Sequence, residues 1–386
     1  MNTWQTRRDG LVKWPGYGRG PAYGERVNNA YDVAVVGAGI VGLGHAAAAH
    51  ARGLRTVVVE RSPRARGATV RGSGHVGTTL QVDAHRALAA RTRELFLSYA
   101  PRARFWLARR GTLAVATADD ELEVLRGAGT GRILSGREVT DLAPVAGAIG
   151  GALYRDDMQL NPREMAPAFA AWLAAEGVDF RWRTTALGAD PGSLATSRGD
   201  IRADNIVFCV GVDLESLWPD LAARHGVRRR ATDMMLATGV GLEFPVITGS
   251  TMLRHEVFRE TPAHADLLSR FERERPDIID LGVGQTYAEV SGLGVLIGAA
   301  HRDEDDAWPF QEEVAFDVLS REARRLFGQK RLDVRQRWRA VAAAVPGDTL
   351  RARAGDGIHV SAAGGDSAMS MGLALGETVL ADLYGP

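Results

Sequence analysis

The sequence predicts an α/β protein whose parallel sheet begins near the N-terminus, is interrupted by insertions, and is completed by the last strand. Three observations indicate this class. A strand–turn–helix–strand pattern opens at Tyr31, residues 230–300 are rich in strand-like apolar runs, and the chain closes with a strand, a glycine turn and a helix. The inserted strands are therefore expected to form a separate, strand-rich unit.

The opening segment, YDVAVVGAGIVGLG, indicates a dinucleotide-binding turn of the Rossmann-like type. An apolar strand ending at Val36 is followed by Gly37, Gly39 and Gly42. Gly37 permits the tight turn, Gly39 lets a pyrophosphate approach the backbone, and Gly42 lets the helix pack against the strand. The first amides of the helix, together with its dipole, then face the phosphates.

A second apolar strand, Thr56 to Val59, ends at Glu60, roughly 20 residues after the turn, where a carboxylate accepts a hydrogen bond from a ribose hydroxyl. The same carboxylate would repel a 2′-phosphate, so we expect the site to refuse NADP. An ordinary βαβ unit with a glycine-rich turn is the alternative, but it does not require three glycines and the acid together. Gly72, Gly74 and Gly77 repeat the glycine spacing after a polar, basic stretch, so we do not interpret them as a second nucleotide fold.

Composition narrows the function classes. The 386 residues, 45% of them hydrophobic, suffice for one large domain or two ordinary ones. The 47 basic and 47 acidic residues balance, so nucleic acid and anionic membranes are not expected partners. No apolar run reaches the ~18 residues of a membrane span and the N-terminus lacks a signal-peptide core, so a cytoplasmic location is expected. Because Cys209 is the single cysteine, an internal disulfide and a multi-cysteine metal site are excluded. We interpret Cys209 as a buried structural thiol. We expect no bound metal.

Further elements follow from local signals. Residues 1–30 are expected to be an extension, packed on the body through Trp4 and Trp14. Residues 83–109 predict one helix, or two broken near Pro101. Residues 311–327 predict another helix, and strands are expected at VDFRW, DNIVFCVG, MMLATGV, TMLRHEVF, GVLIGAA and GIHVSAA.

Two helix starts carry specific signals. Asn161 is a predicted N-cap, with Pro162 at the first helical position and Gly177 after the helix end. The closing GGDS turn, residues 364–367, precedes the last helix, whose free amides would form an anion site. A simply capped helix with glycine in its turn is the alternative interpretation, and both remain open.

Several segments together resemble one family over about residues 31–384. These are VGAGIVGLG with Glu60 and Arg61, RGATVRGSGHVGTTLQ, DNIVFCVG and GGDSAMSMGLALGE. The chain resembles the FAD-dependent amine and amino-acid oxidases typified by glycine oxidase, D-amino acid oxidase and monomeric sarcosine oxidase. Three pieces look more narrowly like a bacterial branch associated with aminophosphonate metabolism: GATVRGSGHVGTTLQ, VGQTYAEVSGLGVLIGAAHR and RQRWRAVAAAVP.

The resemblance implies a domain division. An FAD-binding domain of the glutathione-reductase type would comprise residues 31–82, 151–229 and 341–386. An antiparallel-sheet substrate domain would comprise residues 83–150 and 230–340.

The resemblance also implies a set of cofactor-binding residues. They are Gly37, Gly39, Ile40, Val41, Gly42, Glu60, Arg61, Gly67, Ala68, Thr69, Ala186, Gly211, Gly365, Asp366, Ser367 and Ala368. Gly72 and Ser73 depart from the larger residues expected in the branch, and Asp366 is unusual beside a flavin that becomes negative on reduction. Cys209 does not lie where sarcosine-oxidase-like enzymes attach flavin, so noncovalent FAD is expected, with a link through His75 as the alternative.

The implied reaction removes hydride from the carbon beside an amine nitrogen, delivers it to the flavin, and leaves an imine that hydrolyses; molecular oxygen then reoxidises the flavin. Residues expected at the reacting end are Arg71, His75, Gln285 and His301. The two histidines are candidates for proton handling, and Arg71 is a candidate for binding the acidic group of a small anionic amine. Further candidate cations are Arg254, Arg302 and Arg337, whereas Trp338 is expected to serve in packing.

Two other functions remain compatible with these features. One is a flavin dehydrogenase that acts on a hydroxy acid or passes electrons to an acceptor other than oxygen. The other is a nonenzymatic nucleotide-binding protein. The sequence does not set the oligomeric state.

Overall fold

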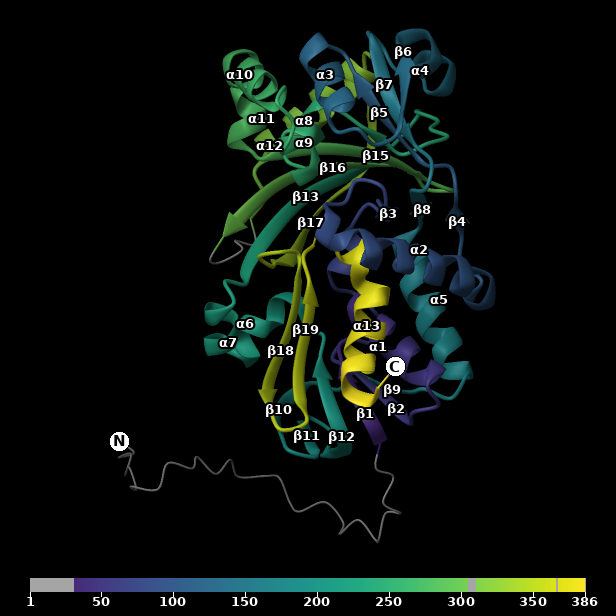
Figure 1. The fold of residues 1–386 in the computed structure, drawn as a ribbon, viewed down its shortest axis with the longest axis vertical. Helices are drawn as coiled ribbons and strands as arrows, with labels where there is room; N and C mark the ends of the chain where they lie inside the picture. The colour runs from purple at the N-terminus through teal and green to yellow at the C-terminus, as the bar shows by residue number, and fades with distance from the viewer. Residues whose placement is uncertain (1–30, 305–309, 366, 386) are drawn as a thin grey trace, which may run out of the picture.

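The computed structural model describes residues 31–304, 310–365 and 367–385. They form an elongated body with a parallel sheet at one end and a larger, mostly antiparallel sheet at the other, as Figure 1 shows. The α/β class with a second sheet domain is therefore confirmed. The predicted packing of Trp4 and Trp14 lies outside the described residues.

The first sheet is parallel at its centre. Its parallel strands run in the order β19 (Ile358–Ala363), β12 (Ile201–Phe208), β1 (Tyr31–Val36), β2 (Thr56–Glu60) and β9 (Asp179–Trp182). Strand β18 (Thr349–Gly355) adds antiparallel to β19, and the hairpin β10 (Ala186–Asp190) and β11 (Ser193–Thr196) extends from β12. Strand β1 carries no exposed residue, as expected for the centre of a sheet covered on both faces.

Glycines allow the helices on this sheet to pack at the backbone. Helix α1 (Ile40–Ala51) crosses α13 (Ala368–Tyr384) closely. A Cβ on Gly44 would lie 2.6 Å from the carbonyl oxygen of Gly372, and one on Gly376 would lie 2.5 Å from the backbone of Gly44. The N-terminal and C-terminal segments of the chain are joined here, which explains how the last helix completes the first domain.

Two further helices cover the same core. Helix α5 (Pro162–Ala175) begins as predicted, because Asn161 Oδ1 accepts a hydrogen bond from the Arg163 amide at 3.1 Å, and Gly177 follows its end with a φ of +102°. Helix α2 (Asp83–Ala103) is continuous, with Pro101 in its last turn. Helix α2 packs on α5 and α13 and so contacts the nucleotide-binding half, whereas residues from 83 onward were expected in the substrate domain.

The second sheet contains eight strands. Their order is β17 (Asp333–Ala344), β13 (Arg228–Thr238), β16 (Gly294–Glu304), β15 (Val283–Val290), β14 (Val246–Ile247), β5 (Thr112–Ala116), β7 (Gly150–Tyr154) and β6 (Arg132–Ser135). Neighbours are antiparallel except β14 and β5. Strand β7 includes residue 151 and β17 includes residue 341, the two positions at which the other domain boundaries were expected.

Helices cover the outer face of the second sheet. They are α3 (Asp119–Gly127), α4 (Gly136–Leu142), α10 (His264–Glu274), α11 (Pro276–Asp280) and α12 (Glu313–Leu326). The short helices α8 (Gly249–Met252) and α9 (Glu256–Arg259) occupy TMLRHEVF, so the predicted strand there is wrong. Apolar residues in this segment pack into the core from helical turns, which a short apolar run does not distinguish from a strand.

A small third sheet joins the two halves. It consists of β3 (His75–Val76), β8 (Met158–Leu160) and β4 (Leu107–Ala108). In Figure 1 it lies between the two larger sheets, and the short 3-10 helix η1 (Ala68–Arg71) leads into it. The chain therefore passes from the glycine turn to the domain junction within 40 residues of β1.

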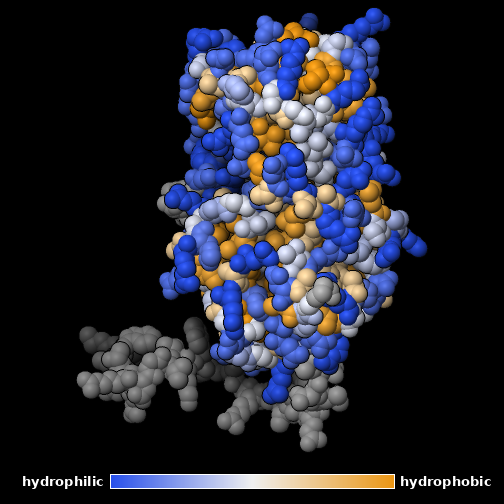
Figure 2. All heavy atoms as spheres, viewed as in Figure 1, coloured by the Kyte–Doolittle hydropathy of each residue, from blue (hydrophilic) through white to orange (hydrophobic). Residues whose placement is uncertain are grey.

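The surface is of mixed polarity. Figure 2 shows hydrophilic and hydrophobic residues interspersed over the visible face. Within the described ranges, no helix combines the length and the apolar character needed to cross a bilayer.

Candidate active site

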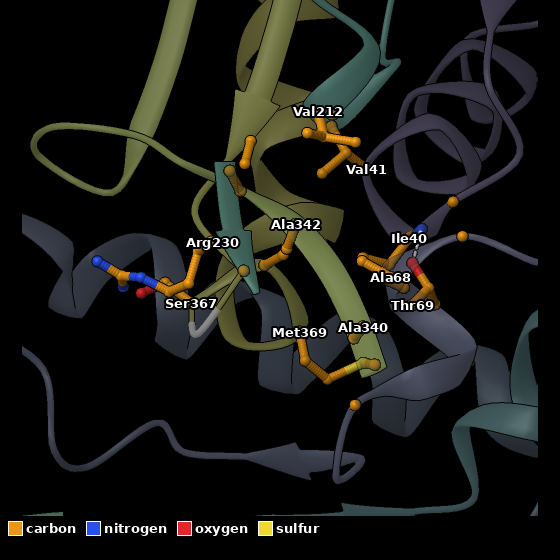
Figure 3. A pocket seen from close by; sticks show the side chains of 18 of the residues that line it. Ile40, Val41, Ala68, Thr69, Val212, Arg230, Ala340, Ala342, Ser367 and Met369 are labelled. Carbon is orange, nitrogen blue, oxygen red and sulfur yellow. Dashed lines mark hydrogen bonds between the residues drawn. The ribbon is translucent and has the colours of Figure 1, made fainter. Parts of the chain in front are cut away.

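A cavity of about 1530 Å³ lies between the two large sheets. Its walls come from the glycine turn, η1, the final turn, β13, β16, β17 and the α8–α9 segment. Figure 3 shows Ile40, Thr69, Ala342 and Met369 around this space, from elements far apart in the sequence. Pockets for a single drug-sized ligand occupy roughly 300–1,000 Å³, so this cavity has room for a dinucleotide and a small second molecule.

The glycine turn has the geometry that its spacing predicts. Gly37 has a φ of +106°, and a Cβ there would lie 2.5 Å from the carbonyl oxygen of Cys209. Gly39 lines the cavity at the start of α1. Gly42 does not line it, but a Cβ on Gly42 would lie 1.9 Å from the carbonyl oxygen of Gly37. Gly37 and Gly42 therefore permit close backbone contacts, and Gly39 leaves the N-terminus of α1 open to phosphate.

Glu60 is fixed beside this turn. Its Oε2 accepts from the Ala38 amide at 3.0 Å, and its Oε1 accepts from the Ser62 amide at 2.8 Å. Arg61 pairs with Asp213 at 2.7 Å. Glu60 and Arg61 line the cavity, as do Ala186 and Gly211. The resemblance assigns these four residues to the binding of FAD.

The loop after β2 is tied to the helix N-terminus. The hydroxyl of Thr69 accepts from the Ile40 amide at 2.9 Å, and a Cβ on Gly39 would lie 3.3 Å from that same oxygen. Gly67, Ala68 and Thr69 line the cavity, as does Val41. The loop thus runs across the mouth of the phosphate-binding turn toward the domain junction.

The final turn is closed by backbone hydrogen bonds. The Gly365 amide donates to Ala343 O at 2.9 Å, the Ser367 amide to Gly364 O at 3.0 Å, and the Ala368 amide to Gly364 O at 2.7 Å. All three donors line the cavity, but the expectation that their amides serve a flavin is not supported, because each already has an acceptor. Asp366, the other residue expected here, lies outside the described residues.

The two histidines expected at the reacting end, His75 and His301, both line the cavity. His75, on β3, places its Nε2 at 2.6 Å from Thr112 Oγ1 and 3.7 Å from Asp157 Oδ2. His301, on β16, lies opposite Thr232 of β13. Sequence reasoning missed Asp157, since nothing in a turn between two strands signals that its carboxylate is turned inward.

Arg71 lies on the same loop, four residues before His75. Its side chain is exposed and lines the cavity, and its backbone carbonyl accepts from the Trp338 indole at 2.8 Å. The guanidinium of Arg163 lies 4.8 Å from the centre of the Trp338 ring. Trp338 therefore packs on the loop and ties it to β17 rather than forming a wall of the cavity.

The remaining arginine candidates divide into two groups. Arg254 lines the cavity against β15, where a Cβ on Gly284 would lie 2.8 Å from its Cδ. Arg259, which sequence reasoning missed, lines it from α9. Arg302 and Arg337 do not line the cavity. Arg302 lies 4.0 Å from the carboxylate of Glu312, and Arg337 pairs with Glu313.

Gln285 does not reach the cavity, which corrects the expectation that it is catalytic. Its side chain is buried and donates to the carbonyl of Leu319 on α12 at 3.0 Å. Its neighbours Gly284 and Thr286 line the cavity instead, because alternate residues of a strand face opposite sides of the sheet.

Cys209 is buried at the end of β12, and burial raises the pKa of its thiol well above the ordinary value. The thiol therefore stays protonated and is a poor nucleophile. Within the described part of the chain, no group of three or more histidine, cysteine or acidic side chains is arranged to hold a metal ion.

Comparison with known proteins identifies the family. The model described as "DAO: FAD dependent oxidoreductase" matches residues 32–383. A search of the curated proteins gave no match.

Solved structures share the whole fold. Glycine oxidase from Bacillus cereus ATCC 14579 has a TM-score of 0.75 at 18% identity, covering 92% of this chain and 95% of its own. L-proline dehydrogenase from P. horikoshii has a TM-score of 0.76 at 16% identity, covering 93% and 94%. L-alpha-glycerophosphate oxidase from Mycoplasma pneumoniae, solved with FAD bound, has a TM-score of 0.70 at 15% identity, covering 91% and 94%.

The cavity fits the cofactor that this family uses. The glycine cradle, the α1 N-terminus and the fixed Glu60 carboxylate are suited to the pyrophosphate and ribose, and the cavity continues from them to the domain junction. The chain belongs to the DAO family of FAD-dependent oxidoreductases.

Proposed function

We propose that this enzyme oxidises the C–N bond of a small amine or amino-acid-like substrate that carries an acidic group. One observation carries the proposal: Arg71 and His75 line the cavity from a single loop, which follows β2 and is tied to the start of α1 by the hydrogen bond from the Ile40 amide to Thr69. A cation and a proton acceptor are therefore held together where that loop enters the domain junction. FAD, when bound, supplies the acceptor for the hydride.

The residues of this chain would do the remaining work. The Arg71 guanidinium would bind a carboxylate or phosphonate through two parallel hydrogen bonds. His75, or His301 of β16, would take the proton of the substrate ammonium, because the amine must be neutral for its lone pair to assist. The imine product then hydrolyses, and molecular oxygen is the proposed electron acceptor.

The resemblance to the aminophosphonate-associated branch makes a phosphonate a specific candidate. Arg254 and Arg259 line the same cavity from the α8–α9 side, so guanidinium groups approach it from two directions. A phosphonate offers three oxygens to such groups, one more than a carboxylate. Parallel assays with 2-aminoethylphosphonate, its N-methyl derivative, glycine and N-methylglycine would separate the two substrate classes.

Replacing Arg71 with alanine is expected to raise the KM for an acidic amine about 10- to 100-fold, since a charged hydrogen bond contributes about 1.5–3 kcal/mol. Bound FAD should be retained. Steady-state kinetics and the flavin absorbance of the purified variant measure the two effects. Arg337→Ala is the control, because Arg337 pairs with Glu313 away from the cavity. An unchanged KM in Arg71→Ala would show that another group binds the anion.

Oxidation of a hydroxy acid, or electron transfer to an acceptor other than oxygen, is the second candidate. The similar fold of L-alpha-glycerophosphate oxidase supports this second candidate, because the substrate in that enzyme's name is a phosphorylated alcohol. Oxygen consumption with peroxide detection, run with amines and with hydroxy acids, discriminates the two candidates. Peroxide formed only with amines supports the primary proposal.

We expect FAD to be noncovalent. Cys209 is a protonated, buried thiol, and the Nε2 of His75 is engaged by Thr112. Denaturing the purified holoenzyme and filtering it should therefore release all the flavin into the filtrate. Flavin that remains with the polypeptide would point to a covalent link.

A further inference from the structure

The Asp157 carboxylate is buried beside the cavity and has no part in the function proposed so far. It lies between β7 and β8 and is fully buried. Its Oδ1 accepts from the Thr78 amide at 2.8 Å and from the Thr79 amide at 2.9 Å. Its Oδ2 has no hydrogen-bond partner among the described residues and lies 3.7 Å from His75 Nε2.

This carboxylate is an anion. Burial alone would raise the pKa of Asp157, but the neighbouring His75 imidazole, the Thr79 amide and the Thr112 hydroxyl together lower it below the ordinary value. Tyr154 of β7 also faces it: burial and then the Asp157 charge raise the pKa of that phenol. The groups that titrate around Asp157 are therefore an imidazole and a phenol, and only the imidazole lines the cavity.

The arrangement gives the two ring nitrogens of His75 different surroundings. Nε2 is turned inward, 2.6 Å from the hydroxyl of the fully buried Thr112. A Cβ on Gly77 would lie 3.0 Å from the ring, so glycine lets the imidazole lie against the backbone. His75 lines the cavity, and Nδ1 is its second ring nitrogen.

We propose that Asp157 is a positioning residue which, with the Thr112 hydroxyl, keeps the proton of neutral His75 on Nε2 and so presents the Nδ1 lone pair to the substrate. This inference rests on the proposed amine oxidation. One proton passes from the substrate ammonium to Nδ1, and the amine lone pair that is released assists departure of the hydride to FAD. The Asp157 charge stabilises the resulting imidazolium, which later gives its proton to water.

The Asp157→Asn substitution removes the negative charge of the carboxylate and keeps the size and shape of the side chain. The amide oxygen of asparagine can still accept from Thr78 and Thr79, but its NH₂ group faces Nε2 and favours the tautomer with the proton on Nδ1. Asp156→Asn is the matched control, since Asp156 is the adjacent residue, its side chain is 71% exposed, and it pairs with Arg93 instead.

The first readout is the protonation of the His75 ring, measured by NMR on the holoenzyme with isotope-labelled histidine. The wild type and Asp156→Asn should carry the proton on Nε2, and Asp157→Asn on Nδ1. An unchanged tautomer in Asp157→Asn would overturn the proposal. Should Asp157→Asn fail to fold, Thr112→Val is the second variant, because it removes the hydroxyl at Nε2 and retains the Asp157 carboxylate. It is expected to lower the fraction of His75 that carries its proton on Nε2. An unchanged fraction would equally overturn the proposal.

The second readout is the rate of anaerobic flavin reduction by N-methylglycine and by 2-aminoethylphosphonate. Asp157→Asn should reduce it about 100-fold or more at neutral pH. The rate should recover as the pH rises, because the substrate then loses its proton to water; a loss of fold would not recover in this way. In a His75→Gln background, Asp157→Asn should have no further effect, and an additive loss would contradict the positioning role.

The two readouts separate this proposal from the proposed function. If neither amine reduces the flavin of the wild type while the tautomer shifts as expected, the substrate assignment fails and the positioning of His75 stands. If the amines reduce the flavin and the tautomer does not depend on Asp157, the function stands and this inference fails.

Discussion

Gly42→Ala is expected to yield a protein that does not retain FAD. A Cβ at this position would lie 1.9 Å from the carbonyl oxygen of Gly37, so α1 could not remain where it is. Displacing α1 would move its N-terminus away from the phosphate position, would break the hydrogen bond from the Ile40 amide to Thr69, and would strain the contact of α1 with α13.

The measurement is flavin absorbance per polypeptide after purification, followed by titration of the apoprotein with FAD. We expect at least a 100-fold loss of FAD affinity, equal to about 2.7 kcal/mol or more. Gly241→Ala is the matched control, because a Cβ at Gly241 meets no atom within 4 Å. A Gly42→Ala protein that binds FAD as the wild type does would contradict the assignment of the glycine turn.

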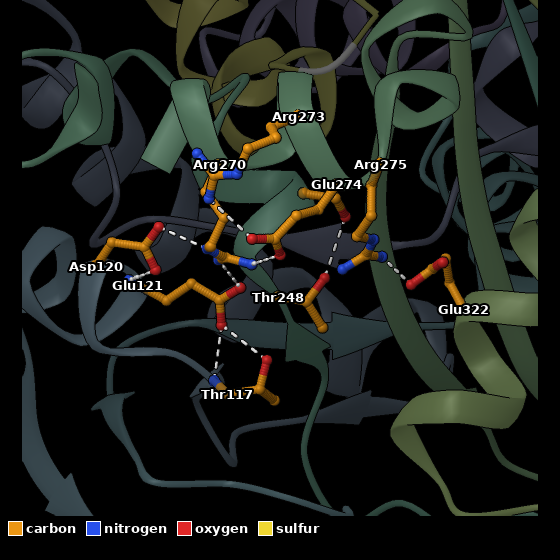
Figure 4. A network of polar contacts seen from close by, with 10 residues as sticks. Thr117, Asp120, Glu121, Thr248, Arg270, Arg273, Glu274, Arg275 and Glu322 are labelled. Carbon is orange, nitrogen blue, oxygen red and sulfur yellow. Dashed lines mark hydrogen bonds and ion pairs between the residues drawn. The ribbon is translucent and has the colours of Figure 1, made fainter. Parts of the chain in front are cut away.

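Glu121→Ala is expected to lower the free energy of unfolding by about 3–5 kcal/mol. Figure 4 shows the buried network to which this carboxylate belongs. Glu121 accepts from the Thr117 amide at 2.6 Å and from the Arg270 guanidinium at 2.8 Å, and Arg270 also pairs with Asp120 at 2.6 Å. Removing Glu121 leaves the partly buried Thr117 amide without this acceptor and the largely buried Arg270 guanidinium with one carboxylate fewer.

This network also bears on the cavity. A Cβ on Gly249 would lie 2.3 Å from Glu121 Oε1, so the start of α8 packs directly on the carboxylate. Thr251 and Arg254, a few residues later, line the cavity.

Urea denaturation of the apoproteins measures the free energy of unfolding of the Glu121→Ala variant, with Glu123→Ala as the control. Glu123 is 56% exposed and pairs with Arg126 one turn along its own helix, so its removal should cost about 0.5 kcal/mol or less. Equal losses in the two variants would show that the buried network does not contribute as described.

The glycine turn and its acid could be predicted because they follow from local geometry. The spacing of Gly37, Gly39 and Gly42 and the position of Glu60 depend on one βαβ unit, and that unit forms as expected. The start of α5 was equally local, since Asn161 caps a helix whose first residue is proline. Such signals need no knowledge of the rest of the chain.

The features that were missed depend on tertiary contacts. Gln285 lies between two residues that line the cavity, and the strand register alone decides that it faces α12. Asp157 reaches His75 only because β3 and β8 pair across more than 70 intervening residues. The Gly365 amide is engaged because β17 returns beside the final turn, which the turn sequence does not indicate.

The most direct test of the central claim is the visible spectrum of the purified protein, followed under anaerobic conditions as an acidic amine is added. We expect flavin bands that are bleached by N-methylglycine or an aminophosphonate and not by a hydroxy acid. Bleaching by the hydroxy acid alone would move the assignment to the alternative function. A protein that binds no FAD, even when FAD is supplied, would contradict the account of the cavity itself.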